Sequence, residues 1–468
     1  MPVNSFDNYY MSWKPSLKNT ALPFYQALAR QLEDDIRNGI LLPGTKLPPQ
    51  RELADFLDIN LSTVTRAFKI CMQKGLIVSS TGNGTYISSD VSYDSNMLIL
   101  NPLEEKVIEM GAILPGRAPN KHVTEAIESV LKEPNAEILM QYNSNLYNTR
   151  QRLMAASWIA KTGLTTDYHS ILFASGGQNA LTAILAGLFH AGDKIACDAF
   201  TYPGLKSAAK LLGIILIPLK EYSEEALNNA HKYHNIKGIY VIADYHNPTT
   251  HVLDISARQL IAFFARKNNI IILEDAINAL LTVNRYPPIY TFAPEHTIYF
   301  ISLSKTLAPG LRLAYVLAPS QYQNDISMAL YNMNISVSPL LGQAAATLIQ
   351  SGAADTILSE RQSFIIARNR IVNEYLSAYQ VEGDDTCPFR WLILPVGYTS
   401  HTFELLARAS KVQVYAADRF LVGSTLPYEA IRFSVVSEEN TDNFIKGIKI
   451  IKKLLDDAHE EREKESLL

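Results

Sequence analysis

The stretch "YFISLSKTLAPGLRLAYV" (residues 299–316) places Lys305 between an apolar run and a turn that leads to Arg312. The run before the lysine is rich in aromatic and β-branched residues and predicts a buried strand. Pro309 and Gly310 predict the turn that follows it. A lysine in this place is either an ordinary surface residue or an amine held in position to react, and the ends of the other strands decide between the two.

Four further strand-like runs also end in polar clusters, and they are "SILFASGGQNAL" (170–181), "KIACDAFTYPG" (194–204), "GIYVIADYHNPTT" (238–250) and "NIIILEDAIN" (269–278). Helical runs separate these strands, which predicts an α/β fold from about residue 103 onward. In an open α/β sheet, ligands bind at the edge formed by the carboxyl ends of the strands. The polar clusters therefore predict one site that includes Lys305.

Small residues just before a helical run predict a phosphate site at Gly176, Gly177 and Gln178, because the N–H groups at a helix N-terminus bind anions. A glycine turn that only allows the chain to enter the helix would explain the same residues. Asp275 ends an almost wholly apolar strand, where a buried carboxylate is unfavourable unless a cation meets it. A helix cap is the alternative role for Asp275.

Asn247 and Tyr202 each precede a proline, and alone they would be a turn residue and a rim aromatic. Lys305 joins these groups, because a lysine amine in a desolvated pocket can form a Schiff base. A carbonyl cofactor that also carries a phosphate would use every group named, and pyridoxal 5′-phosphate is such a cofactor. Lys305 would be the catalytic residue and would bind the cofactor as an aldimine. The expected cofactor-binding residues are Gly176, Gly177, Gln178, Tyr202, Asn247, Asp275, Ser302, Ser304, Lys305 and Arg312.

The expected role of each residue follows from an atom of the cofactor. Asp275 would pair with the protonated pyridine nitrogen, Asn247 would donate to the phenolic oxygen, and Tyr202 would stack on the ring. The phosphate would be bound by Gly177, Gln178, Ser302 and Arg312.

Residues 20–89 predict a small α+β unit at the N-terminus. An apolar residue recurs every four positions from Phe24 to Ile36 and predicts a first helix, and "QRELADFL" (50–57) predicts a second. The runs "LIVSS" and "TYISS" flank the turn "TGNG" and predict a hairpin. The unit is therefore expected to be a helix-turn-helix with a wing.

A third helix is expected to begin at Ser62 as its N-cap and to end before Gly75. Thr63, Thr65 and Arg66 supply the small polar and basic side chains that a helix in the major groove needs. A helical interaction module is the alternative, because exposed threonines and arginines are often only solvated. The N-terminal 90 residues hold nine Lys and Arg against eight Asp and Glu, a balance that favours DNA only weakly.

The stretch "LPPQRELADFLDINLSTVTRAFKICMQKGLIVSSTGNGTYI" (47–87) resembles the winged helix-turn-helix of the GntR family of bacterial transcription regulators. The resemblance implies a double-stranded DNA operator as partner. The DNA-binding residues that it implies are Arg51, Ser62, Thr63, Thr65, Arg66, Gly82 and Gly84.

The ordered motifs "SGGQ", "TYPG", "HNPT", "LEDA", "SLSKTLAPGLR" and "AIRFS" resemble the fold-type I aminotransferases. Behind a GntR-type winged helix, they make the chain similar to the MocR subfamily of regulators. The resemblance implies that Arg432 binds the carboxylate of an amino acid, for which a guanidinium fork is well suited, whereas a surface salt bridge is the alternative. It also implies a homodimer, commonly head-to-tail.

The resemblance implies an α/β fold with large, mainly parallel, and small aminotransferase-like domains behind the winged helix. The expected boundaries are 20–89 for the DNA-binding domain, 90–102 for a linker and 103–468 for the aminotransferase-like part, with a large subdomain at about 140–340 and a small one at about 345–460 that includes 103–139.

The sequence departs from the aminotransferase pattern at several positions. Ile277 stands where many relatives have a tyrosine, Asn145 and Leu146 stand in place of a Pro-x-Gly turn, and Thr250 replaces a glycine. These changes put efficient transamination in doubt. We therefore expect a transcription regulator that senses pyridoxal phosphate or a small amine or amino-acid effector through an aldimine at Lys305. An active aminotransferase with an accessory DNA-binding unit is the alternative, and a scaffold used only for dimerisation is a third.

The composition of the 468 residues, with 47% hydrophobic residues and a net charge of −4, is that of a globular protein. Three widely spaced cysteines, Cys71, Cys197 and Cys387, predict neither a disulfide framework nor a metal site. The N-terminus lacks a basic-then-apolar leader, and the apolar runs are too short to span a bilayer. These features predict a cytoplasmic protein with no membrane partner, and the family resemblance implies that it is bacterial.

Overall fold

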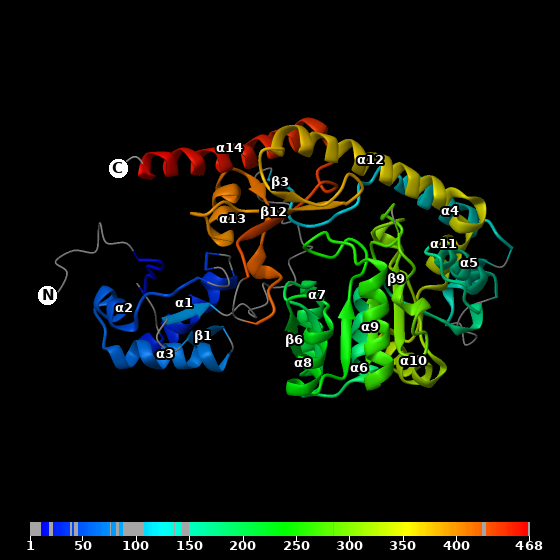
Figure 1. The fold of residues 1–468 in the computed structure, drawn as a ribbon, viewed down its shortest axis with the longest axis horizontal. Coiled ribbons are helices and arrows are strands. Elements are labelled where there is room, and N and C mark those ends of the chain that lie inside the picture. The colour runs from blue at the N-terminus through cyan, green and yellow to red at the C-terminus, as the bar shows by residue number, and fades with distance from the viewer. Residues whose placement is uncertain are drawn as a thin grey trace.

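The computed structural model describes residues 11–17, 22–37, 40–41, 45–74, 76–80, 84–87, 107–134, 136–142, 149–283, 285–423 and 427–466. Figure 1 shows three regions in them: a small N-terminal unit, a large sheet covered by helices, and a smaller sheet beside long helices. The predicted α/β class with a separate N-terminal unit is confirmed.

The N-terminal unit consists of three helices and a hairpin, which are α1 (Phe24–Arg37), α2 (Gln50–Leu57), α3 (Leu61–Gln73), β1 (Ile77–Ser80) and β2 (Gly84–Ile87). The apolar positions that recur along α1, including Leu28 and Leu32, are buried with Val64 and Phe68 of α3. The two strands pair antiparallel. The described residues of this unit thus form a helix-turn-helix followed by a wing.

The prediction that Ser62 is the N-cap of α3 is wrong. The helix begins at Leu61, and the flanking residue is Asn60, whose dihedral angles are extended (φ −62°, ψ 139°). The backbone carbonyl of Asn60 accepts a hydrogen bond from the N–H of Thr63 at 2.9 Å. Ser62 therefore lies inside the first helical turn, and its side chain is exposed.

Seven strands form the large sheet in the order β4-β10-β9-β8-β7-β5-β6. Their bounds are β4 (Ile171–Ala174), β5 (Lys194–Asp198), β6 (Ile215–Leu219), β7 (Gly238–Val241), β8 (Ile271–Asp275), β9 (Thr297–Ser302) and β10 (Ala314–Leu317). Strands β5 to β9 pair in parallel, whereas β10 is antiparallel to both β9 and β4. The carboxyl ends of the parallel strands consequently lie at one edge of the sheet.

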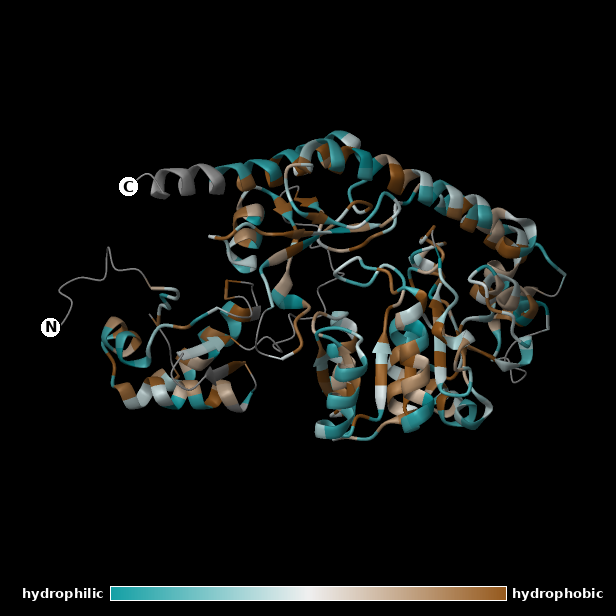
Figure 2. Cartoon of the chain, in the orientation of Figure 1, coloured by the Kyte–Doolittle hydropathy of each residue, from teal (hydrophilic) through white to brown (hydrophobic). Residues whose placement is uncertain are grey.

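The strands are connected by α6 (Gly177–Leu188), α7 (Pro203–Leu212), α8 (Glu224–His234), α9 (Ile255–Asn268), η3 (Ile289–Thr291) and η4 (Pro309–Leu311). The elements that precede β4 are η1 (Ala136–Met140), α5 (Thr149–Ala160) and η2 (Tyr168–Ser170), and those that follow β10 are α10 (Ser320–Asn334) and α11 (Pro339–Ser351). Core clusters lie on both faces of the sheet. In Figure 2 its strands are largely hydrophobic, as expected for strands that are covered on both sides.

The smaller sheet contains β11 (Val381–Glu382), β12 (Phe389–Ile393), β15 (Ala430–Ser434) and β14 (Tyr415–Ala416), in that order. It is accompanied by α12 (Ala353–Leu376), α13 (Ser400–Ala409), η5 (Ala417–Arg419) and α14 (Thr441–Ser466). The chain before the large sheet contacts both regions. Its β3 (Ile108–Glu109) pairs with β13 (Val412–Gln413), whereas α4 (Asn120–Leu131) buries Val123 in the same core as Trp158.

Across the described part of the chain, none of the helices combines the length and the apolar character that crossing a membrane requires. The same residues contain no group of three or more His, Cys, Asp or Glu side chains placed to hold a metal ion.

Candidate functional site

Lys305 lies in the turn that follows β9, at the edge where the parallel strands end. The N–H of Leu303 donates to the carbonyl of Leu313 at 3.0 Å and closes this turn. The Nζ of Lys305 donates to the backbone carbonyl of Ile113. Burial and, to a smaller extent, the charges of Arg432 and Arg361 lower the pKa of Lys305 from 10.5 to about 8. The amine is therefore held inside the protein and is more readily neutral, as a nucleophile must be.

Asp275 is the last residue of β8 and is 6% exposed. Its Oδ2 accepts a hydrogen bond from the hydroxyl of Tyr240 at 2.8 Å, and its Oδ1 accepts one from the N–H of Ile277 at 3.1 Å. Burial raises the pKa of Asp275 to about 6. Among the described residues both of these donors are neutral, so the carboxylate fits a ligand that brings a cationic nitrogen, such as a protonated pyridine.

The start of α6 forms a cradle for an anion. Gly176 precedes the helix with φ 92°, and no side chain caps the first turn. A Cβ atom on Gly176 would lie 2.7 Å from Nη2 of Arg312, which itself donates to the carbonyl of Ser175 at 3.1 Å. Glycine is therefore needed where the guanidinium approaches the backbone, and the uncapped N–H groups and the cation suit a phosphate.

Two serines lie against the same helix start. A Cβ atom on Gly177 would lie 3.3 Å from the Cβ of Ser302, which places this serine beside the first turn of α6. The hydroxyl of Ser302 donates to the hydroxyl of Ser304 at 3.2 Å. The next residue of the helix, Gln178, donates from Nε2 to the carbonyl of Gly204 at 3.0 Å, and its Oε1 is buried without a hydrogen-bond partner in the structure.

Tyr202 immediately precedes α7, and its pKa is influenced by charged groups from several parts of the site. Burial and, to a smaller extent, the negative charge of Asp275 raise the pKa of Tyr202 to about 12. Arg432 and Arg312 act in the opposite direction. The carboxylate and the two guanidinium groups thus lie near the tyrosine, a setting that fits a ring that stacks on a bound cofactor.

Arg432 is buried, at 3% exposed, and is not part of a surface salt bridge. Its Nη1 donates to Oδ1 of Asn247 at 2.5 Å, and its Nη2 donates to the carbonyl of Gly111 at 2.6 Å. Its Nε is buried without a hydrogen-bond partner in the structure. Burial lowers the pKa of Arg432 to about 10. A guanidinium has five N–H donors, so three remain beyond these two contacts, and a carboxylate fits them because it offers two acceptor oxygens and a compensating charge.

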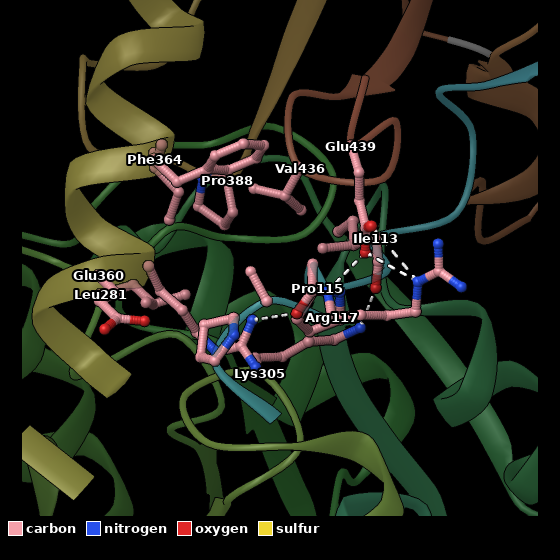
Figure 3. A pocket seen from close by; sticks show the side chains of 15 residues that line it. Ile113, Pro115, Arg117, Leu281, Lys305, Glu360, Phe364, Pro388, Val436 and Glu439 are labelled. Carbon is pink, nitrogen blue, oxygen red and sulfur yellow. Dashed lines mark hydrogen bonds and ion pairs between the residues drawn. The ribbon is translucent and has the colours of Figure 1, made fainter. Parts of the chain in front are cut away.

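A cavity of about 330 Å³ opens beside Lys305. Figure 3 shows it between Phe364 and Pro388 on one side and Ile113 and Arg117 on the other. None of the other residues predicted to bind the cofactor lines this cavity.

Sequence reasoning missed Tyr240, Arg361 and the acceptors in residues 111–116. Arg361, on α12, is buried and donates to the carbonyls of Thr306, Leu307 and Gly116. The number of residues between Lys305 and Arg361 does not indicate that the two lie near each other in the fold. Tyr240 lies inside an apolar strand, where an aromatic residue usually serves the core.

Thr250 is buried and adopts φ 67°, a left-handed conformation that is rare for a β-branched residue. A glycine would adopt this conformation without strain, whereas the threonine adopts it at some cost. Gly82, Asn145 and Leu146 lie outside the described residues.

The predicted DNA-binding residues of α2 and α3 lie on the surface of the N-terminal unit. Arg51, Ser62, Thr65 and Arg66 are exposed, and Thr63 is partly exposed.

Two contacts hold these side chains in place. The hydroxyl of Thr65 donates to Oε1 of Gln50 at 2.8 Å and connects α3 to α2. The guanidinium of Arg66 lies 4.0 Å from the ring centroid of Tyr25. Gly84 begins β2 with φ 111°, a conformation suited to glycine at the tip of a wing.

A winged helix-turn-helix joined to an aminotransferase-like fold defines a class of protein, the transcription regulators with an aminotransferase-like domain. Comparisons with known proteins identify both parts. Residues 24–87 match the family of bacterial regulatory proteins called gntR, and residues 116–448 match the family called aminotransferase class I and II.

Relatives cover the whole length of the chain. The "Uncharacterized HTH-type transcriptional regulator YdeF" of Bacillus subtilis is 46% identical over 98% of this chain and 100% of its own. The "HTH-type pyridoxine biosynthesis transcriptional regulator PdxR" of Corynebacterium glutamicum is 22% identical over 70% of this chain and 73% of its own. The chain thus belongs to the GntR family of regulators, and to its MocR type with an aminotransferase class I and II domain.

Solved structures share the fold of the larger part. A kynurenine aminotransferase of Pyrococcus horikoshii has a TM-score of 0.68 and 20% identity, covering 76% of this chain and 92% of its own. The α-aminoadipate aminotransferase LysN of Thermus thermophilus has a TM-score of 0.67 and 20% identity, covering 75% and 92%.

Proposed function

We propose that this transcription regulator binds pyridoxal 5′-phosphate at Lys305 and uses the bound cofactor to sense pyridoxal phosphate itself or an amino-acid-like effector. The observation that carries the proposal is the buried carboxylate of Asp275, which has a raised pKa and shares one electrostatic environment with Tyr202, Arg312 and Arg432. The two described donors to Asp275 are neutral, and a buried carboxylate is stabilised when a cation meets it. It therefore fits a cation that a ligand supplies.

Each residue has a separate task in this proposal. Lys305 would be the amine that binds the aldehyde, and its lowered pKa keeps more of that amine neutral. Asp275 would hold a proton on the ring nitrogen. When bound, the cofactor supplies a carbonyl carbon to which amines add and a ring that withdraws electrons. The guanidinium of Arg432 would orient an effector by its carboxylate.

Phosphate binding would rest on the first turn of α6. Its uncapped N–H groups, the hydroxyls of Ser302 and Ser304 and the guanidinium of Arg312 would share the charge of the phosphate. Gln178 would complete this set.

The DNA affinity of the N-terminal unit would depend on which ligand is bound at the cofactor site. We place the DNA contacts on Arg51 and on the exposed residues of α3. We also keep the predicted organisation, in which residues 20–89 bind DNA, 90–102 connect, and 103–468 form the aminotransferase-like part of a homodimer. An effector can change DNA affinity only by the difference in its binding to the free and DNA-bound forms.

Two measurements test this proposal. Purified protein mixed with pyridoxal phosphate should develop visible absorbance that the Lys305→Ala variant lacks. Binding to DNA from upstream of its own gene should then change when cofactor or amines are added. Equal DNA binding under all of these conditions would refute the sensing role.

An active aminotransferase is the second candidate, favoured by the buried guanidinium of Arg432, whose charge acts on Lys305 and which contacts Asn247. It predicts multiple turnovers with an amino donor and a 2-oxo acid. A single turnover or none would exclude it.

A further inference from the structure

The cavity beside Lys305 is distinct from the set of residues proposed to hold the cofactor. It has a volume of about 330 Å³ and is bounded by the segment before α4, by one face of α12 and by the loops that contain Pro388 and Val436 (Figure 3). Lys305 is the one residue that both lines this cavity and belongs to the residues proposed to hold the cofactor. The cavity therefore adjoins the reactive amine, and Asp275 is not part of its lining.

Most of the lining is apolar. Ile113, Leu281, Phe364, Pro388 and Val436 all line the cavity. For comparison, a dry apolar cavity of about 150 Å³ holds a benzene molecule. The space beside Lys305 thus accommodates an aliphatic or aromatic side chain of considerable size.

The charged groups in the lining already have partners. Nε of Arg117 lies 3.3 Å from Oε1 of Glu439, which also accepts a hydrogen bond from the backbone N–H of Arg117 at 2.5 Å. Oε1 of Glu360 lies 3.5 Å from Nε2 of His122.

The guanidinium of Arg361 is likewise occupied, because it donates to backbone carbonyls on both sides, including that of Gly116 at 3.0 Å. The ion pairs of Arg117 and Glu360 are exposed and contribute little, so the apolar lining decides: a charged ligand tail would lose hydration against it, which is unfavourable.

We propose that the cavity is the side-chain subsite for the effector and that it selects an amino acid with an extended apolar side chain. The inference rests on the proposed function. The amino group of the effector would meet the cofactor held at Lys305, its carboxylate would meet Arg432, and its side chain would lie against Phe364 and Val436. Small side chains leave this apolar surface in contact with water, and charged ones lose their hydration.

A titration of the cofactor-loaded, full-length protein tests the selectivity. Alanine, norleucine and ornithine are added, and the absorbance change gives a half-saturation concentration for each. Each buried methylene should improve binding about fourfold, so norleucine should act at a concentration roughly 60-fold lower than alanine. Ornithine has nearly the same shape as norleucine but ends in an ammonium group, and it should bind at least tenfold more weakly than norleucine.

A pair of phenylalanine variants locates the effect. Phe364→Ala should reduce the preference for norleucine over alanine by at least fivefold. Phe263→Ala removes an exposed phenylalanine of α9, at 63% exposed, and should leave this preference unchanged. Melting temperatures of the loaded protein with each amino acid should follow the same order, which gives a readout independent of absorbance.

The outcomes separate the inference from the proposed function. Equal half-saturation concentrations for alanine and norleucine, tighter binding of ornithine, or an unchanged preference in Phe364→Ala would each overturn the subsite while leaving the cofactor site intact. Absence of any absorbance that depends on Lys305 would instead overturn the proposed function, and the subsite with it.

Discussion

Replacing Asp275 by asparagine should stabilise the cofactor-free protein and weaken cofactor binding at the same time. Burial raises the pKa of Asp275 from 3.8 to about 6. A carboxyl group whose pKa is higher in the folded chain than in the unfolded chain binds its proton more tightly when folded. The free energy of unfolding therefore falls as the pH rises from about 4 to about 6, and it stays low above that range.

The magnitude follows from this shift. About two pKa units at about 1.4 kcal/mol each give a penalty of about 3 kcal/mol at pH 7.5. An asparagine cannot ionise and avoids this penalty. Its single side-chain oxygen can accept from Tyr240 or from the N–H of Ile277 but not from both, which costs about 1 kcal/mol. The net stabilisation should be about 2 kcal/mol at pH 7.5 and below about 1 kcal/mol at pH 5, where about half of the penalty remains.

Urea denaturation followed by tryptophan fluorescence measures this difference, because Trp158 and Trp391 report on the large and the small sheet regions. Pyridoxal phosphate should reverse the order of stability, since it stabilises wild type more than Asp275→Asn. Tyr240→Phe keeps the ionisable carboxyl but removes a hydrogen bond to it, so it should destabilise the cofactor-free protein at pH 7.5. An asparagine variant that is less stable than wild type at pH 7.5, or a difference that does not change with pH, would refute the reasoning.

Three further predictions follow from the lysine, the recognition helix and the N-terminal core. The rate at which cofactor absorbance develops should rise with pH and level off above about 8, because only neutral Lys305 attacks an aldehyde, and a midpoint near 10.5 would contradict the lowered pKa. Arg66→Ala should weaken binding to all DNA sequences and reduce the salt dependence by about one counterion, as measured by anisotropy across salt concentrations, and an unchanged slope would remove Arg66 from the phosphate contacts. Leu28→Ala should destabilise the N-terminal unit by about 2–5 kcal/mol and abolish DNA binding while the cofactor absorbance remains, and loss of both would show that the two parts do not fold separately.

The sequence predicted the edge of the large sheet well, because strand ends have a local signal. The apolar runs of β8 and β9 stop at Asp275 and Ser302, and parallel strands bring such residues to one edge whatever their distance in the chain. The bounds of α2 were predicted for the same reason, since prolines precede it and its apolar period is clear. The start of α3 was missed because either of two neighbouring polar residues, Asn60 or Ser62, could precede the helix.

Contacts between separate helices and strands have no local pattern in the sequence, so they could not be predicted in this way. Tyr240 reaches Asp275 only because β7 and β8 are neighbours in the sheet, with Tyr240 paired opposite Leu273. A tyrosine inside an apolar run looks the same whether its hydroxyl serves the core or a site. Arg361 lies on a helix of 24 residues and reaches the site from there, which its position in the sequence does not indicate.

Residue types also do not reveal which backbone groups take part in the site, and much of the site is built from such groups. Arg432 donates to the carbonyl of Gly111 and Lys305 donates to that of Ile113, so two cations from different sheet regions meet one short segment whose side chains do not make these contacts. Ile277 likewise contributes its N–H to Asp275, although its side chain departs from the pattern that the family resemblance predicts. Any residue other than proline supplies that N–H. A departure from a family pattern at such a position removes the side-chain contact alone, and the backbone part of the site is retained.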